Sequence, residues 1–153
     1  MVLEKILPKA WKRAALLSAT WAAAVGAFSL IMNAIPSLAI PLLFVIIPLS
    51  LAVPAAIGFA IVREFASKGR IDTKAAAIEG AKAGPIYAVI MVIVGLFFTL
   101  VNYGIAALYW GVETFVEGII VMVLTVVIGL PIVAVIATIA GALGGAIYSM
   151  LNK

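Results

Sequence analysis

The sequence predicts an all-α integral membrane protein with four transmembrane helices and both termini in the cytoplasm. Of its 153 residues, 67% are hydrophobic and only 10% are charged. A soluble domain is about 45–50% apolar and about 25% charged, so this chain lacks the polar side chains that would cover a globule in water. The charges also divide the chain into uncharged runs long enough to cross a bilayer, which predicts a membrane protein of one domain, residues 1–153.

The first uncharged run, residues 14–62, predicts a helical hairpin. As one helix it would measure about 73 Å at roughly 1.5 Å per residue, more than twice the hydrocarbon core of about 30 Å. Turn-forming residues in its middle occur at 33–37, with the sequence NAIPS. We therefore expect spans at about 14–34 and 38–62.

A second helical hairpin is predicted over residues 83–152. Its two uncharged runs, 83–112 and 118–152, are each long enough for one tilted span and too short for two. The connection between them, around 104–118, is expected to be a long outer turn whose tip protrudes or lies along the interface.

A cytoplasmic loop, residues 63–82, is predicted to join the two hairpins. Asp72 or Thr73 in this loop is suited to the N-cap of a helix that begins before the third span.

The basic residues predict the orientation. All 10 lysines and arginines lie before the first span, in the 63–82 loop or at the C-terminal end, and four spans bring these segments to one side. The positive-inside rule assigns that side to the cytoplasm. The expected location is the cell membrane, or an envelope derived from it, with multiple passes.

An internal repeat is a further possibility. When the first hairpin is aligned with the second, Arg13 falls on Lys82 and Asn33 on Asn102. Both hairpins start from the same side, so the repeat would be parallel. Chance matches are common in a chain this rich in alanine, valine, isoleucine and glycine, and both interpretations stay open.

Small residues recur every four positions in each span, which places them on one helix face. Helices in bilayers approach closely at such faces, because lipid tails are as apolar as leucine and packing must supply the attraction. The candidate helix-packing residues are Ala19, Ala23, Gly26, Ala56, Ala60, Gly80, Gly84, Ala137, Gly141 and Gly145.

The distribution of side-chain size predicts a tapered bundle. In the last three spans the small residues occupy the cytoplasmic half, whereas bulky residues such as Phe44 and Phe97 occupy the outer half. We expect helices that lie close together near the cytoplasm and splay outward. The resulting wedge would curve a membrane or fit a curved lattice; the alternative is a small bundle whose shape has no role.

Four prolines inside the spans predict helix kinks: Pro48, Pro54, Pro85 and Pro131. Each removes a hydrogen bond and frees the carbonyl four residues earlier, those of Phe44, Ser50, Ala81 and Val127. Freed carbonyls either line an ion path, as in broken transporter helices, or are satisfied by neighbouring groups.

The composition disfavours enzyme, metal and cofactor chemistry. The chain has no His and no Cys, which removes the commonest general base, thiolate nucleophiles and most metal ligands. For the same reason no cofactor is expected. No nucleic-acid partner is expected either, because the basic residues lie beside apolar spans rather than on a free basic face. The shortage of Asn, Gln and Cys fits a thermophile, or apolar spans with little room for amides.

Glu113 and Glu117 lie four positions apart near the outer surface. They could form a cation-attracting pore mouth, or they could be acids favoured by the N-terminus of the last span.

Three motifs, GFA at 58–60, GAKAG at 80–84 and GGA at 144–146, resemble those of uncharacterised small four-span membrane proteins of archaea. The resemblance covers the layout of most of the chain and implies no activity. The sequence as a whole predicts a non-enzymatic protein in the lipid bilayer, a homo-oligomer that self-associates through its small-residue faces as a membrane scaffold or an envelope or virus-particle lattice protein. The alternative is a passive oligomeric pore or small-solute channel.

Overall fold

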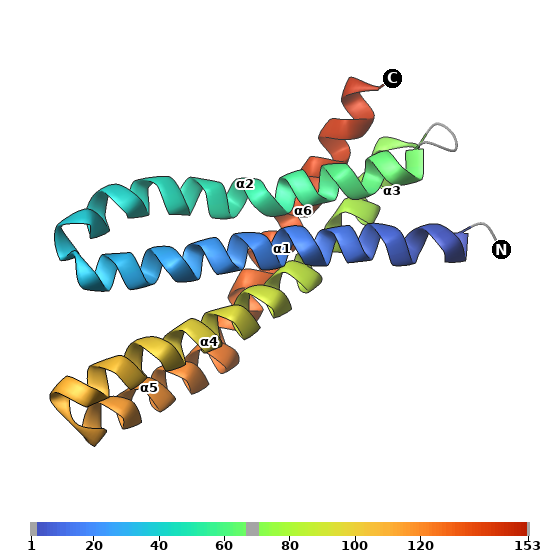
Figure 1. Ribbon diagram of the computed structural model, residues 1–153. Coiled ribbons are helices and arrows are strands. Elements are labelled where there is room, and N and C mark those ends of the chain that lie inside the picture. Colours follow the sequence, from blue (N-terminus) through green and yellow to red (C-terminus); the bar gives the residue numbers. More distant parts are fainter. Residues whose placement is uncertain (1–2, 67–70, 153) are drawn as a thin grey trace.

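The computed structural model describes residues 3–66 and 71–152, with side chains from residue 11 onward. Every element in these residues is helical (Figure 1). The order is α1 (Leu3–Ala34), η1 (Pro36–Leu38), α2 (Ala39–Ala66), α3 (Thr73–Ala81), α4 (Ala83–Trp110), α5 (Val112–Leu124), the π-helical turn η2 (Thr125–Gly129) and α6 (Leu130–Leu151). The predicted all-α class is confirmed, with 4 helical segments long and apolar enough to cross a membrane.

Two helical hairpins form the molecule. The short helix η1 joins α1 to α2, and Gly111 joins α4 to α5. Both turns lie at one end of the molecule, and the first turn of α1 and the last turn of α6 lie toward the other (Figure 1). We refer to the end with the two turns as the turn end and to the other as the α3 end.

The hairpins are packed together at the α3 end and diverge toward the turn end (Figure 1). Helix α6 packs against α2, α3 and α4, and α1 packs against α2 and α4. Among the described residues, α5 contacts neither α1 nor α2. The shape is therefore the taper that the distribution of small and bulky residues predicts.

The core is small and lies where the hairpins meet. It is a cluster of Ala14, Ile57, Ile61, Ala83, Tyr87 and Ala137, with Trp21 packed against it. Large apolar side chains near the turn end are exposed instead, such as Phe44 at 78% and Leu108 at 83%. Exposed apolar surface on this scale suits contact with lipid rather than water.

The expectation of a long outer turn around residues 104–118 is wrong. Helix α4 continues to Trp110 and α5 begins at Val112, so Gly111 alone makes the turn. Its φ is 93°, a conformation that glycine adopts without a Cβ clash, and its N–H donates to the Ala107 carbonyl at 2.9 Å. The additional residues of this hairpin extend its helices rather than a loop.

Most of the expected 63–82 loop is also helical. Helix α2 continues to Ala66, and α3 occupies Thr73–Ala81. Asp72 is the N-cap of α3, as predicted: its carboxylate accepts a hydrogen bond from the Lys74 N–H at 3.3 Å. The Ser149 hydroxyl of α6 lies 3.1 Å from that of Thr73 and donates to the Ile71 carbonyl at 3.2 Å, which ties this segment to α6.

One of the four prolines, Pro85, occupies a position different from that expected. Pro48 and Pro54 lie inside α2. Pro85 is instead in the first turn of α4, because the helix breaks at Lys82, and a missing N–H has no consequence there. Pro131 follows the π-helical turn η2, where the Leu130 N–H donates to the Thr125 carbonyl, so the helical hydrogen bonding is irregular just before this proline.

Candidate functional site

Backbone contacts between helices hold the α3 end together. A Cβ on Gly144 of α6 would overlap the Ala55 carbonyl of α2, and a Cβ on Gly145 would overlap the Ala76 carbonyl of α3. Gly80 of α3 meets Gly141 of α6 in the same way. Helices come this close only where side chains are absent, which is the close packing expected of small residues in a bilayer.

Within one chain, the predicted helix-packing residues fall into three groups. Gly26, Gly80, Gly84, Ala137, Gly141 and Gly145 are buried. Ala19 and Ala60 are half-buried, and Ala23 and Ala56 are exposed. On α1 the buried small row is Ala14, Ser18, Ala22 and Gly26, one position away from the row that contains Ala19 and Ala23. Two adjacent rows of this helix are rich in small residues, so periodicity alone did not distinguish the buried row from the other.

Gly58 and Gly144 also make close helix contacts and were not among the predicted packing residues. A Cβ on Gly58 would overlap the Gly141 carbonyl. The available signal was the Gly144-Gly145 pair, because adjacent glycines let one helix meet two neighbours at the same level.

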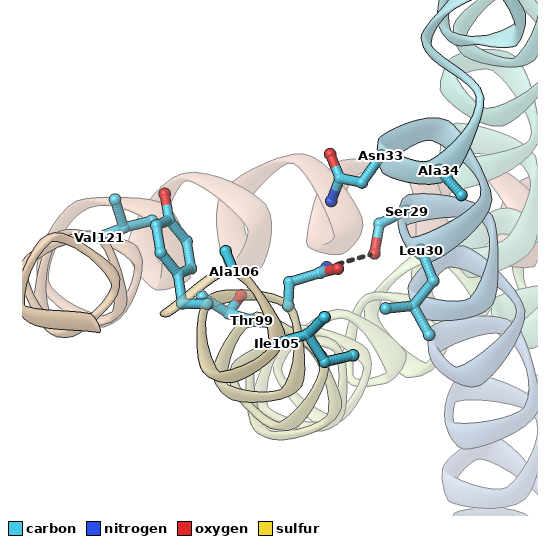
Figure 2. A pocket seen from close by; sticks show the side chains of 10 residues that line it. Ser29, Leu30, Asn33, Ala34, Thr99, Ile105, Ala106 and Val121 are labelled. Carbon is cyan, nitrogen blue, oxygen red and sulfur yellow. Dashed lines mark hydrogen bonds between the residues drawn. The ribbon is translucent and has the colours of Figure 1, made fainter. Parts of the chain in front are cut away.

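A cleft opens where the hairpins separate. Helices α1 and α4 pack closely at Gly26, where a Cβ would overlap the ring of Phe98. Beyond it lies a cavity of about 740 Å³ between α1, α4 and α5 (Figure 2). Its lining is Ser29, Leu30, Asn33, Ala34, Thr99, Asn102, Tyr103, Ile105, Ala106 and Val121.

The polar groups of this inter-hairpin cleft are amides and hydroxyls. The Asn102 amide donates to the Ser29 hydroxyl oxygen at 3.4 Å, and Ser29 donates to the Gly26 carbonyl at 2.7 Å (Figure 2). Asn33, from the last turn of α1, projects toward the same space (Figure 2). Among the residues that the structure describes, no charged side chain belongs to the lining. The two asparagines that the proposed repeat aligns are thus brought to one cleft.

The carbonyl that Pro54 frees is satisfied by a neighbouring helix. The Tyr87 hydroxyl of α4 donates to the Ser50 carbonyl at 3.4 Å. Of the two interpretations of the proline-freed carbonyls, the contact at Ser50 matches satisfaction by a neighbouring group.

Glu113 and Glu117 lie on α5, close to its N-terminus, and both are exposed. Neither lines the inter-hairpin cleft. Their position near a helix N-terminus is electrostatically favourable for acids. A pore mouth made from these carboxylates would therefore require several copies of the chain.

Comparison with protein-family models, with curated proteins and with solved structures finds no match for this chain.

Proposed function

We propose that this protein is a non-enzymatic structural protein of a membrane, which self-associates as a scaffold or as a lattice protein of an envelope or virus particle. The observation that carries the proposal is the wedge: glycine contacts such as Gly80 with Gly141 bring the helices together at the α3 end, and the hairpins diverge at the turn end. The charge distribution assigns the narrow end to the cytoplasm.

A wedge of this kind has a mechanical consequence. Copies packed side by side need more area in the outer leaflet than in the inner one, so an array of them favours a membrane that is convex outward. The backbone contacts at the narrow end fix the distance between the helices there, because a helix cannot move closer to a carbonyl it already touches.

Self-association must use surfaces that the fold leaves free. The glycines at 80, 84, 141 and 145 are buried between helices of one chain, so they cannot also bind a second copy. Ala23 on α1 and Ala56 on α2 are exposed, and both belong to the small-residue rows predicted for self-association. We therefore assign the contact between copies to the α1–α2 hairpin.

The test is to reconstitute the full-length protein into liposomes and to record vesicle shape and particle order by electron cryomicroscopy. We expect regular arrays or narrowed, strongly curved membranes, without ion leakage. The double variant Ala23→Leu/Ala56→Leu should lose the arrays, whereas Ala75→Leu, a change at an exposed alanine on α3, should retain them.

Two results would overturn the proposal. A compact monomer in mild detergent, together with unchanged vesicle shape, would remove both the self-association and the wedge. A small closed ring with a cation leak that Glu113→Gln reduces would indicate the passive oligomeric pore instead.

A further inference from the structure

The inter-hairpin cleft contains polar side chains without partners. In the described part of the chain, the side chains of Asn33, Thr99 and Tyr103 make no hydrogen bond. Thr99 differs in this from the threonines at 20, 125 and 138, whose hydroxyls each donate to the carbonyl four residues earlier. These polar atoms are accessible from the cleft, and where lipid rather than water surrounds them a partner is favourable, so these side chains favour a bound molecule that supplies one.

The lining defines the chemistry of that molecule. Amide N–H groups and hydroxyls donate hydrogen bonds, and the absence of a charged side chain in the lining gives no counter-ion for a phosphate, a carboxylate or an amine. The other lining residues, including Leu30, Ile105 and Val121, are apolar. An uncharged oxygen-bearing group attached to a hydrocarbon chain matches both the polar and the apolar lining residues. The volume of the cleft, about 740 Å³, lies in the range of small-molecule sites, roughly 300–1,000 Å³.

The position of the cleft favours a lipid over a solute from water. Asn33 and Ala34 are the last two residues of α1, at the level where the first span ends. The α4–α5 hairpin diverges from α1 and α2 toward the turn end (Figure 1), and the lining residues Asn33, Ala34 and Ile105 are exposed, so the cleft is open rather than enclosed. At this depth the oxygens of a bilayer are those that join lipid chains to glycerol.

We infer that the inter-hairpin cleft binds one uncharged acylglycerol-type lipid. Its ester oxygens accept hydrogen bonds from Asn33, Thr99 and Tyr103, and its chain lies against Leu30 and Ile105. This site is independent of the contact between copies proposed above, because Ala23 and Ala56 do not line it.

The probe is a monoacylglycerol that carries a diazirine on the first carbons of its chain, added to the full-length protein in phosphatidylcholine nanodiscs. Illumination should label peptides that contain residues 29–34 and 99–106, and unlabelled monoacylglycerol should compete. Glycerol and the fatty-acid anion should compete at least tenfold less well.

Two sets of variants test the assignment. Asn33→Leu and Thr99→Val should each lower labelling by about fivefold, the loss expected for one hydrogen bond, whereas Asn152→Leu outside the cleft should leave it unchanged. Ala106→Phe fills the cleft and should abolish labelling, whereas Val89→Phe, at an exposed position of the same helix, should not.

Three outcomes would overturn the inference. Labelling that is spread over the exposed face of α2, and unaffected by the cleft variants, would indicate annular lipid only. Equal competition by the fatty-acid anion would exclude an uncharged ligand class. Absent labelling together with a change of oligomer size in Ala106→Phe would assign the cleft to a second copy of the chain.

Discussion

The Tyr87 hydroxyl on α4 donates a hydrogen bond across 3.4 Å to the Ser50 carbonyl on α2, the carbonyl that Pro54 deprives of its helical donor. The bond links two helices that otherwise make limited contact, and it lies beside the buried core. The carbonyl that the proline frees in one hairpin thus accepts a hydrogen bond from the other hairpin.

Removing the Tyr87 hydroxyl should therefore destabilise the fold through Ser50. We expect Tyr87→Phe to lower the free energy of unfolding by about 1 kcal/mol, because the carbonyl that Pro54 frees loses this donor. Denaturant titration in detergent measures the change. Tyr109→Phe, at an exposed ring, is the matched control and should have no effect.

A double-mutant cycle identifies the mechanism. Pro54→Ala restores a backbone N–H that can donate to Ser50, so Tyr87→Phe should be less destabilising in that background. Equal effects in both backgrounds would show that the hydroxyl does not act through the proline-freed carbonyl.

The surroundings of the glycines predict that glycine-to-alanine substitutions change the stability of the protein in opposite directions at different positions. Gly144→Ala should destabilise the protein by about 1–3 kcal/mol, because its Cβ would overlap the Ala55 carbonyl and backbone cannot move aside as a side chain can. A Cβ added at Gly95 would meet nothing within 4 Å. Gly95→Ala should therefore stabilise the protein by about 0.5–1 kcal/mol, since alanine loses less conformational entropy than glycine when a helix folds. Thermal unfolding of the two variants in one detergent makes the comparison, and a destabilised Gly95→Ala would contradict it.

The turn at Gly111 depends on its backbone conformation rather than on space. Its φ of 93° with ψ of 173° is a region that is essentially restricted to glycine, so Gly111→Ala should lower the free energy of unfolding by about 1–3 kcal/mol. Gly104→Ala, with equally open surroundings and helical geometry, is the control and should be neutral or stabilising. Similar unfolding midpoints for the two variants would refute the conformational argument.

The absence of cysteine allows a direct test of orientation. Because the chain has 0 Cys, a single introduced thiol reports one position. We expect a membrane-impermeant maleimide to label Glu117→Cys in intact cells and to label Lys74→Cys only after permeabilisation, since the positive-inside rule predicts a cytoplasmic location for the basic segments. The reverse pattern would invert the topology.

Some features were predictable from local sequence. The hairpin turn after Asn33 and the N-cap at Asp72 depend on neighbouring residues alone, and the structure has both. The extent of the helices was less predictable. The turn is made by Gly111 alone rather than by the longer segment that was expected. The sequence offers both Gly104 and Gly111, and only the structure shows that Gly111 has a φ of 93° whereas Gly104 is helical.

The inter-hairpin cleft was not predictable at all. Ser29 and Thr99 are ordinary residues of apolar spans, and no motif marks them. They become a candidate site because α1 and α4 separate beyond Gly26 and Phe98, which depends on the angle between two hairpins far apart in the sequence.

Composition and charge distribution alone predicted four apolar helical spans, which the structure has, and an orientation for them, because transfer into a bilayer depends on the hydrophobicity and charge of each segment separately. Only the tertiary structure decided that the glycines at 80, 141 and 145 are buried between helices of one chain, and that Ala23 and Ala56 are exposed on its surface. The physical reason is that a small residue permits close approach to any helix, and which helix comes close depends on the packing of all of them together.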